Sequence, residues 1–487
     1  MSNPHPASTR RACGNCRNRK VRCDTLRPVC TQCLTRAFLD DACHYEDSGG
    51  LSTAEELERN ILRLEARIRE LELAEAPDAV RLHQSQSSSF GTPATPHMLS
   101  VSDDSPLEIR RSLLETFLAQ HVPSLEFFLN QSRFVQCALS TLPSSHPSRA
   151  CRGLMNTVYY VASSFNKPLN PPSQVLLEAV GILSTNHPNK ILHAIQAEVL
   201  LATWFLHSNR ILQGKYHLGT AVSLTVGAGL HRIRSRRASQ TVSHRMSLPP
   251  AVDSVEEGER IIGFWKVFAL SNIWDTISGP TSSCIVFNGD GKGIDTPWAW
   301  EMHEYERYAL PENLVGGLTV HNFLVGAPSS AREGLSMISM LAKASVLFSK
   351  AKSFADSVPR TQLNQAQLTH IRACHEYLDN LIDKFTSSLA PIPQDTQISA
   401  SDVHLAVLIH TLAYTSAIHL HSPFAATDAR SSTKSLSVAE LATGLLPYID
   451  YLASQTAEGF PIVNPIFGAL WFVVGKVFEG KRGLCDA

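Results

Sequence analysis

The sequence lacks a long run of hydrophobic residues and has no apolar segment near its beginning. The first residues, MSNPHPASTRR, are polar and do not resemble a secretory signal peptide. The longest apolar stretch, residues 466–478, is too short to span a bilayer, so we expect it to form a buried helix. We therefore expect neither export nor a membrane partner, and the eleven cysteines should stay reduced.

The sequence also lacks the motifs that common classes of enzyme require. It contains no G-x-S-x-G, and the glycine-rich residues 288–293 have neither the spacing of a phosphate-binding loop nor a clear preceding strand. The stretch HEYLD, residues 375–379, begins like a zinc-protease motif, but Asp379 replaces its second histidine. His410, His419 and His421 lie in an apolar stretch, where core or surface histidines are far commoner than metal ligands. We therefore expect that the protein is not an enzyme.

The chain as a whole has no large excess of positive or negative charge, but a segment near its beginning does. The 487 residues suggest two or three compact units, and 44% hydrophobic with 18% charged residues is ordinary for a protein that buries a large core. The formal net charge is only −1. From Arg10 to Arg22, however, there are six cations and no carboxylate, which gives this segment a local positive field.

Six of the cysteines lie close together with the spacing C-x2-C-x6-C-x6-C-x2-C-x9-C, which is one three-cysteine pattern used twice. Tetrahedral zinc takes four ligands, so two separate sites would need eight thiolates. Six suffice if two sulfurs are shared, and by symmetry Cys13 and Cys30, the first cysteine of each half, are the bridging pair. The array therefore predicts two Zn(II) per chain, held by Cys13, Cys16, Cys23, Cys30, Cys33 and Cys43.

Other uses of these cysteines fit less well. A disulfide framework would need an oxidising compartment, which nothing in the sequence provides. A redox C-x-x-C pair would need only two cysteines and a surrounding βαβ pattern, which is absent. A single four-cysteine zinc site with two spare thiols remains an alternative.

Residues 10–46, with CRNRKVRC in the first half of the array and RPVC before the second, resemble the fungal Zn(II)2Cys6 binuclear zinc cluster transcription factors. The resemblance implies a sequence-specific, double-stranded DNA-binding regulator of RNA polymerase II transcription in the nucleus. In that family a helix at the first half enters the major groove and reads a CGG triplet. The lysine that contacts bases corresponds to Lys20, and Arg19 matches the second cation at that site.

The chemistry of the basic residues agrees with this resemblance. The segment 17–22 contains neither Gly nor Pro and is expected to be helical. Guanine presents two acceptors, N7 and O6, to a cationic donor. The remaining arginines, which are expected to contact phosphate and to provide affinity without sequence choice, are Arg10, Arg11, Arg17 and Arg22.

Two other interpretations of the basic segment stay open. It could be a solvated basic tail or a nuclear import signal. The main rival function is a zinc-cluster scaffold or accessory protein that binds partners or nucleic acid without sequence specificity.

A dimerisation element is predicted at residues 52–74, where apolar residues recur at alternating spacings of four and three. Isoleucine at a and leucine at d favour a parallel two-stranded coiled coil, and hence a homodimer on paired half-sites. An amphipathic helix packed on its own chain is the alternative. The core positions are Leu57, Ile61, Leu64, Ile68 and Leu71.

The remainder divides into a linker and a large helical domain. Residues 75–106 are rich in Ser, Pro and Gln and are expected to be a disordered tether. Residues 107–480 show helical periodicity and no alternating strand pattern of comparable length, so the fold class is expected to be mainly all-α. One example is the apolar series Ile195, Val199, Ala202 and Leu206, which predicts one buried helix face.

Two stretches of this domain, residues 212–232 and 258–282, resemble the family's middle homology, or fungal-specific, regulatory domain. The second departs from the usual Leu-Asp-Arg, because Ser271 and Asn272 follow Leu270. The resemblance implies a regulatory domain that responds to transcriptional co-regulators or to a small-molecule effector.

The loop at residues 234–250 contains the sequence RRAS, in which Ser239 follows two arginines. This pattern is typical of a basophilic kinase site, and a phosphate there would offset local positive charge. The alternative is a variable surface loop.

Overall fold

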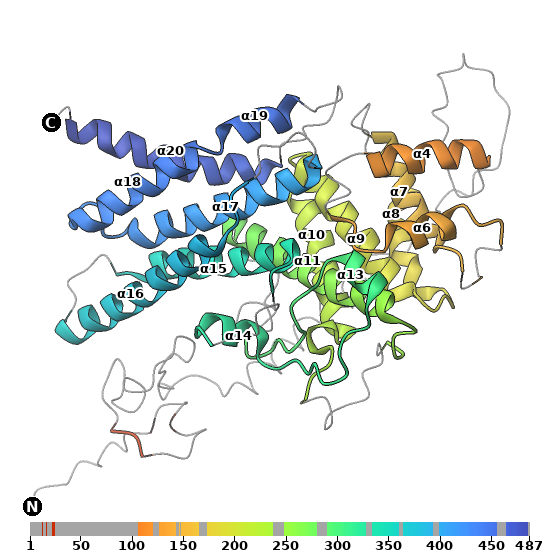
Figure 1. The fold of residues 1–487 in the computed structure, drawn as a ribbon, viewed down its shortest axis with the longest axis horizontal. Coiled ribbons are helices and arrows are strands. Elements are labelled where there is room, and N and C mark those ends of the chain that lie inside the picture. The colour runs from red at the N-terminus through yellow and green to blue at the C-terminus, as the bar shows by residue number, and fades with distance from the viewer. Residues whose placement is uncertain are drawn as a thin grey trace, which may run out of the picture. The chain divides into compact units, whose positions relative to one another are not determined.

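The computed structural model describes residues 12, 16, 22–24, 106–119, 126–142, 146, 148–164, 173–236, 248–279, 290–327, 334–359, 364–392, 399–454 and 464–485. The chain divides into two units, Met1–His97 and Met98–Ala487. Within the described ranges every regular secondary-structure element is a helix (Figure 1). The one β contact there is an isolated bridge between Ser235 and Gly316. The mainly all-α prediction is therefore confirmed.

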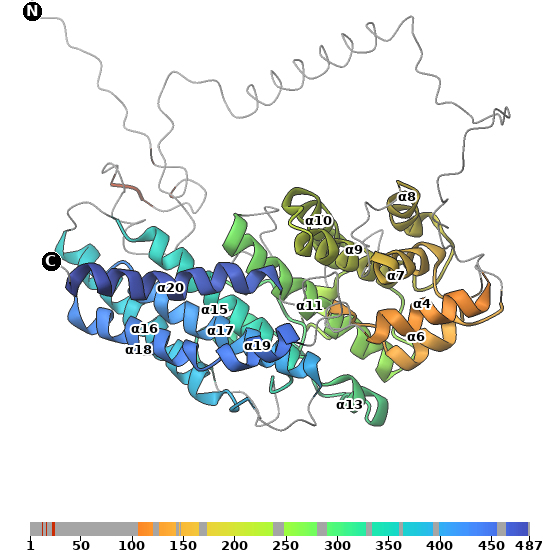
Figure 2. The same ribbon diagram turned by 90° about the horizontal axis from the view of Figure 1, so that it is seen from above.

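The second unit, called the helical unit below, begins with helices that gather at one end in both views (Figures 1 and 2). Helices α9, α10 and α11 lie between this end and the other. The bounds are α4 Leu107–Ala119, α6 Gln131–Ala138, α7 Arg152–Ser164, α8 Ser173–Gly181, η1 Ile182–Ser184, α9 Lys190–His207, α10 Ile211–Gly227, η2 Leu230–Arg232 and α11 Ser254–Ser278.

The second half of the helical unit is an array of longer helices, with α16, α18 and α20 at the opposite end (Figures 1 and 2). Helix α15 packs against both α11 and α17, so the two halves share one continuous core. The bounds are α13 Met302–Arg307, α14 Thr319–Leu324, α15 Met337–Ser357, α16 Gln365–Ser388, α17 Ala400–His421, α18 Ala429–Thr443, α19 Leu446–Ser454 and α20 Pro465–Cys485.

Helix α9 is buried on all sides, although its sequence predicts a single buried face. Ile195, Val199, Ala202 and Leu206 are all 0% exposed, but so is Gln196 between them. The reason is that α7, α10 and α11 all pack against α9. Gln196 is accommodated because its side-chain oxygen accepts from Phe128 N–H at 2.7 Å, and its amide donates to Glu126 O at 3.2 Å. Burial of this polar residue therefore leaves its amide group hydrogen-bonded.

Helix α11 forms the centre of the helical unit. The carboxylate of Asp253 caps its start by accepting from Glu256 N–H at 2.9 Å, and the helix ends before Gly279, whose φ is +83°. Trp265, which is fully buried in the middle of α11, stacks on Trp298 with ring centroids 4.3 Å apart. It also donates to Pro297 O at 2.7 Å, which fixes the loop after residue 290 against the core.

Helix α17 is long and apolar enough to cross a membrane by length and composition, but 78% of its apolar window is buried inside the protein. It packs against α15, α16, α18 and α20, as a core helix does. The apolar stretch at 466–478 lies in α20, where Phe467 and Leu470 are buried and Phe472 is 65% exposed. Burial of α20 is therefore confined to one face. The helix also extends five residues beyond the predicted domain boundary at 480.

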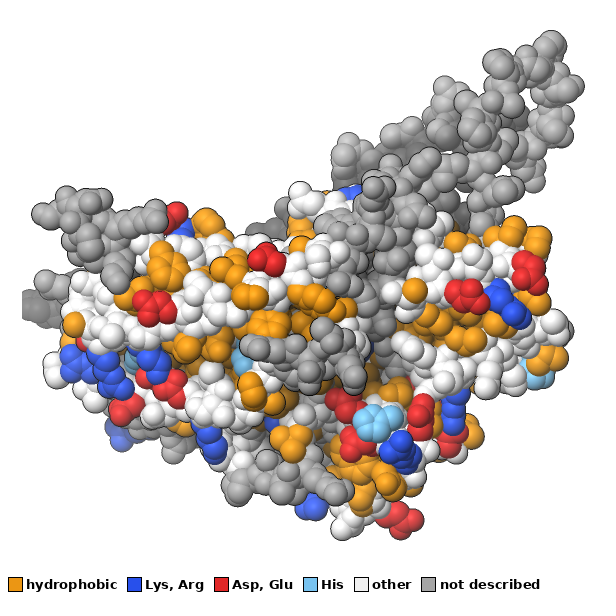
Figure 3. Space-filling model, turned by 45° about the horizontal axis from the view of Figure 1, so that its top comes forward, with side chains coloured by type: hydrophobic (Ala, Val, Ile, Leu, Met, Phe, Trp, Pro, Cys, Tyr) orange, Lys and Arg blue, Asp and Glu red, His pale blue; other side chains and the backbone are white. Residues whose placement is uncertain are grey.

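The surface of the helical unit carries charges of both signs. On the face drawn in Figure 3, Lys and Arg side chains are interspersed with Asp and Glu and with scattered hydrophobic side chains. This differs from the sequence of residues 10–22, where every charged side chain is a cation. The helical unit thus does not continue the charge pattern of the N-terminal segment on this face.

Candidate zinc centre and polar sites of the helical unit

The structure describes two of the six predicted zinc ligands. Cys16 is in helical conformation and 2% exposed, and Cys23 is half-buried. Arg22 and Asp24, which flank Cys23, are exposed and lie outside any helix. The helix predicted over residues 17–22 therefore does not include Arg22. The two cysteines are less exposed than the neighbouring charged residues Arg22 and Asp24, which is the arrangement that a metal-centred basic domain requires.

The other predicted site residues lie outside the described residues. The same holds for the coiled-coil element at 52–74, for the linker up to residue 105, and for the candidate phosphorylation site. The residues concerned are Cys13, Cys30, Cys33 and Cys43; Lys20 and Arg19; Arg10, Arg11 and Arg17; Leu57, Ile61, Leu64, Ile68 and Leu71; and Ser239.

The described cysteines of the helical unit differ in their surroundings from the six cysteines near the N-terminus. Cys137, Cys151 and Cys374 are free cysteines far apart in the sequence, and burial raises the pKa of each thiol; for Cys151 the pKa reaches about 12. Zinc binds the thiolate, so these three are poor ligands. The array at 13–43 instead combines six thiols with six nearby cations, which offset the −2 charge left when six thiolates hold two Zn(II). Its donor set therefore fits a binuclear zinc cluster.

A cluster of Cys151, His187 and His193 brings three potential metal ligands within 4.8 Å of one another in the helical unit. His187 accepts from Asn189 N–H at 3.1 Å through Nδ1 and pairs with Arg149 O at 2.7 Å through Nε2. Both ring nitrogens are thus engaged, and neither offers a lone pair to a cation. Burial, together with the nearby His187, lowers the pKa of His193 to about 3, so this ring stays neutral. The cluster is a hydrogen-bonded core feature rather than a metal site.

A second cluster has the residue types of a hydrolase triad and was not found from the sequence. Nε2 of His421 lies 3.0 Å from Asp379 Oδ1, and Nδ1 lies 3.1 Å from Ser431 Oγ. Ser431 is 1% exposed, however, and its hydroxyl donates to Asp428 at 2.7 Å, so it is neither accessible nor poised to lose its proton to His421. The group instead ties α16, α17 and α18 together. The HEYLD stretch therefore contributes Asp379 to the core.

The charges around Asp379 explain how a buried carboxylate is tolerated there. Burial opposes its ionisation, but the hydrogen bond with His421 and the nearby charges of His421 and Lys434 outweigh burial and lower the pKa of Asp379. Lys434 Nζ lies 3.5 Å from Asp379 and 2.5 Å from Asp383. This network stabilises the α16–α18 contact.

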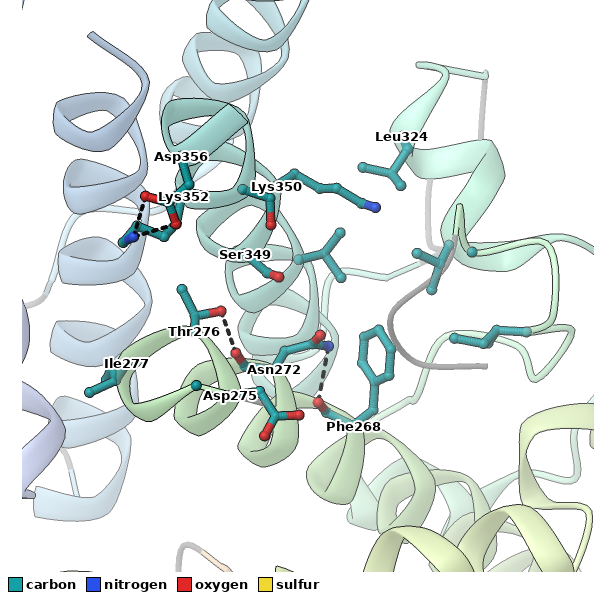
Figure 4. A pocket seen from close by; sticks show the side chains of 16 residues that line it. Phe268, Asn272, Asp275, Thr276, Ile277, Leu324, Ser349, Lys350, Lys352 and Asp356 are labelled. Carbon is teal, nitrogen blue, oxygen red and sulfur yellow. Dashed lines mark hydrogen bonds and ion pairs between the residues drawn. The ribbon is translucent and has the colours of Figure 1, made fainter. Parts of the chain in front are cut away.

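The helical unit also contains a polar pocket of about 500 Å³ between α11, α14 and α15 (Figure 4). Its lining carries both charge signs: Asp275 and Asp356 are acidic, while Lys350 and Lys352 are basic. Lys352 and Asp356 pair with each other at 2.5 Å along α15. The side-chain amide of Asn272, one of the two residues that depart from the middle homology pattern, donates to Phe268 O at 3.1 Å beside the pocket.

Comparison with known proteins identifies the N-terminal segment. Residues 11–50 match the fungal Zn(2)-Cys(6) binuclear cluster domain, so this segment is a zinc cluster domain that binds two zinc ions. The chain is also similar to the heme-responsive zinc finger transcription factor HAP1 of Saccharomyces cerevisiae: the proteins of strains S288c and YJM789 are 35% and 34% identical over 103 residues. These matches cover 19% of this chain and 6% of the length of each relative. No solved structure matches the chain.

Proposed function

We propose that this chain, which carries a fungal Zn(2)-Cys(6) binuclear cluster domain at residues 11–50, is a sequence-specific DNA-binding transcription factor that regulates RNA polymerase II transcription in the nucleus. The observation that carries the proposal is the coincidence of this domain with six cations, and no carboxylate, between Arg10 and Arg22. A basic surface on a rigid small domain is the electrostatic basis of nucleic-acid binding. The similarity to a named transcription factor supports the same conclusion.

The bound zinc ions are proposed to stabilise the folded domain and thereby to orient its basic residues toward DNA. About 40 residues cannot bury enough apolar surface to be stable alone, so bound zinc supplies the folding free energy. Cys13 and Cys30 would bridge the two ions, and Cys16, Cys23, Cys33 and Cys43 would complete the ligand sets. The buried position of Cys16 supports its part in this arrangement.

Two kinds of DNA contact are proposed for the cations. Lys20 and Arg19 would donate to guanine N7 and O6 in a CGG triplet and would provide sequence choice. The exposure of Arg22 supports a contact with the phosphate backbone. The phosphate contacts would come from Arg10, Arg11, Arg17 and Arg22.

A homodimer is proposed because the heptad pattern at 52–74 follows the zinc cluster directly. The residues Leu57, Ile61, Leu64, Ile68 and Leu71 would form the seam of a parallel coiled coil. Two zinc clusters joined in this way would bind two CGG half-sites. Residues 75–106 are proposed to be the tether to the helical unit.

The helical unit is proposed to be a middle homology regulatory domain that receives transcriptional co-regulators or a small-molecule effector. Its large continuous core and all-helical described elements support a regulatory scaffold. The triad-like group at His421 is closed to substrate, which supports a role other than catalysis.

Ser239 is proposed to be phosphorylated by a basophilic kinase. The structure describes the start of this loop, where Arg234 is held by Glu257 at 2.6 Å. Phosphopeptide mass spectrometry of the protein purified from its own cells should detect modified Ser239. Complete coverage of that peptide with only unmodified Ser239, under both growth and stress, would end the proposal.

The test of sequence-specific binding compares two single substitutions in the full-length, zinc-loaded protein. Lys20→Ala should lower the preference for paired CGG over scrambled DNA by about 5- to 150-fold, because a lost base contact costs about 1–3 kcal/mol. Arg11→Ala should weaken both DNAs alike and reduce the salt dependence. Equal losses from both substitutions would instead favour the rival scaffold or accessory role without sequence specificity.

A further inference from the structure

A second pocket of the helical unit lies among α14, α15, α16 and the segment around Trp298, and has a volume of about 450 Å³. This volume falls within the range of small-molecule sites, about 300–1,000 Å³. We call it the lysine pocket. Its described lining residues are mostly apolar or aromatic, with a few polar groups at Thr319, Asn322 and Ser388. Such a composition suits an organic ligand with a hydrophobic body.

Three aromatic rings form a continuous wall of the lysine pocket. Trp298 and Phe323 meet edge to face with centroids 6.1 Å apart, and Phe323 meets Phe385 in the same way at 6.2 Å. Trp298 and Phe385 are 8% and 5% exposed, so the wall is set into the protein rather than displayed on its surface. Met340 and Leu381, also buried, add an apolar floor. A ring or a short hydrocarbon would contact ring edges as well as ring faces along this wall.

The charged side chains of the lysine pocket are all cations. Among its described lining residues are two lysines, Lys343 and Lys384, and no aspartate or glutamate. The ammonium of Lys343 donates to Gly334 O at 2.8 Å and lies 5.0 Å from the ring centroid of Trp298 and 5.7 Å from that of Phe323. Lys384 is exposed on α16 and precedes the wall residue Phe385. Positive charge is therefore placed beside the aromatic wall.

The pocket of Figure 4 lies in the same helical unit but differs from the lysine pocket in the charges of its lining residues. Both pockets use α14 and α15, but the lining of the first includes Asp275 and Asp356 beside its two lysines. Lys352 there is paired with Asp356 along one helix. An anion would meet repulsion as well as attraction in that pocket, and it would meet only lysines among the charged described residues of the lysine pocket.

The wall is held in place by contacts that reach the core. Trp265 stacks on Trp298 and donates to Pro297 O at 2.7 Å. Ser336, at the start of α15, donates to Ala299 O at 2.7 Å. Because these groups come from α11 and α15, the aromatic wall is preorganised rather than assembled by a ligand.

We propose that the lysine pocket binds a small organic anion, with an aromatic or hydrophobic body against Trp298 and Phe385 and a carboxylate near Lys343 and Lys384. This deepens the proposed function by naming the chemical class of its effector. Only the regulatory consequence rests on that function, because binding to the pocket is measurable without DNA. A carboxylate beside a lysine ammonium that lies over aromatic faces combines charge pairing with ring contact.

The test titrates the full-length, zinc-loaded protein by calorimetry with three probes of matched shape: 2-naphthaleneacetate, 2-(2-naphthyl)ethanol and 2-(2-naphthyl)ethylammonium. The anion should bind about tenfold or more tightly than the alcohol, and the cation should bind most weakly, since about 1.4 kcal/mol corresponds to a factor of ten. Equal affinities for all three probes, or no binding of the anion at millimolar concentration, would overturn the assignment.

Substitutions then locate the site. Lys343→Met combined with Lys384→Met should reduce anion affinity to that of the alcohol, about tenfold. The matched control is Lys476→Met, because Lys476 Nζ also lies over a ring, 4.9 Å from the centroid of Phe472, but on α20 away from the pocket lining. Circular dichroism melts verify that each variant is folded. Unchanged anion preference in the folded double variant would place binding elsewhere and contradict the proposal. That conclusion would hold whether or not the protein binds CGG-containing DNA.

Discussion

The zinc cluster domain and the helical unit obtain their stability in opposite ways. Residues 11–50 concentrate six cysteines and an all-cationic run in a segment too small for a core of its own. The helical unit buries a continuous apolar core from α4 to α20, and burial raises the thiol pKa of its described cysteines Cys137, Cys151 and Cys374. Metal ligands and positive charge therefore distinguish the first region, whereas apolar packing distinguishes the second. Each can therefore be disrupted without the other.

The largest effect is expected from the zinc ligands. Cys16→Ser should abolish specific DNA binding, because loss of a ligand removes metal-linked folding free energy on the order of 10 kcal/mol. The thermal midpoint of the helical unit should stay within about 2 °C, since none of its core contacts change. Zinc content by mass spectrometry and circular dichroism melts provide the measurements. A Cys16→Ser protein that keeps two zinc ions and full DNA affinity would remove Cys16 from the ligand set.

The reverse disruption targets Trp265 in α11. Trp265→Ala should destabilise the helical unit by about 3–5 kcal/mol, because it leaves a cavity where a fully buried ring stacks on Trp298. Zinc binding and DNA binding should persist. Phe472→Ala, at a 65% exposed position, is the control and should change stability little. Comparable denaturant midpoints for the two variants would show that α11 is not the centre of the core.

A smaller effect is expected where the chain approaches itself closely. A Cβ on Gly316 would lie 1.7 Å from Asp295 O, whereas a Cβ on the adjacent Gly317 would meet nothing within 4 Å. Gly316→Ala should therefore cost about 2–4 kcal/mol, because the backbone must move, and Gly317→Ala should cost less than about 1 kcal/mol. Urea titrations of both variants measure the difference. Equal midpoints would contradict the close contact between these segments.

The smallest effect is a pH dependence of the helical unit. Burial, followed by the nearby His404, lowers the pKa of His207 to about 3, so the ring is neutral when folded but protonates in the unfolded chain below about pH 6.5. Stability should therefore fall from pH 7 to pH 5, by about 1–2 kcal/mol for this residue. His207→Gln should flatten the pH slope of the unfolding free energy, whereas His303→Gln, at an exposed position, should not. An unchanged slope in His207→Gln would contradict burial of a neutral ring.

The sequence predicts the features that depend on local spacing. Cysteine intervals indicated the zinc cluster domain now matched at 11–50, and helical periodicity predicted the fold class. All-round burial of α9 was not predictable, because it depends on three helices packing around it. The group of Asp379, His421 and Ser431 was missed for a similar reason: its members come from three different helices and only the fold brings them together.

The lysine pocket was likewise beyond sequence reasoning. Its wall combines Trp298 from a loop, Phe323 from α14 and Phe385 from α16, which are separated along the chain and share no motif. Within α16, the spacing of Leu381, Lys384, Phe385 and Ser388 places these residues on one helix face. That local pattern is compatible with any buried face, and only the neighbouring elements show that it borders a pocket.

Zinc-dependent, sequence-specific DNA binding is tested most directly by a binding-site selection from random duplex DNA with the full-length protein, with and without a zinc chelator. We expect enrichment of paired CGG triplets that disappears on chelation, and the spacing between the triplets would define the dimer. Binding that survives chelation, or that enriches no motif, would contradict it. The basic residues from Arg10 to Arg22 would then act as a charge patch without sequence choice.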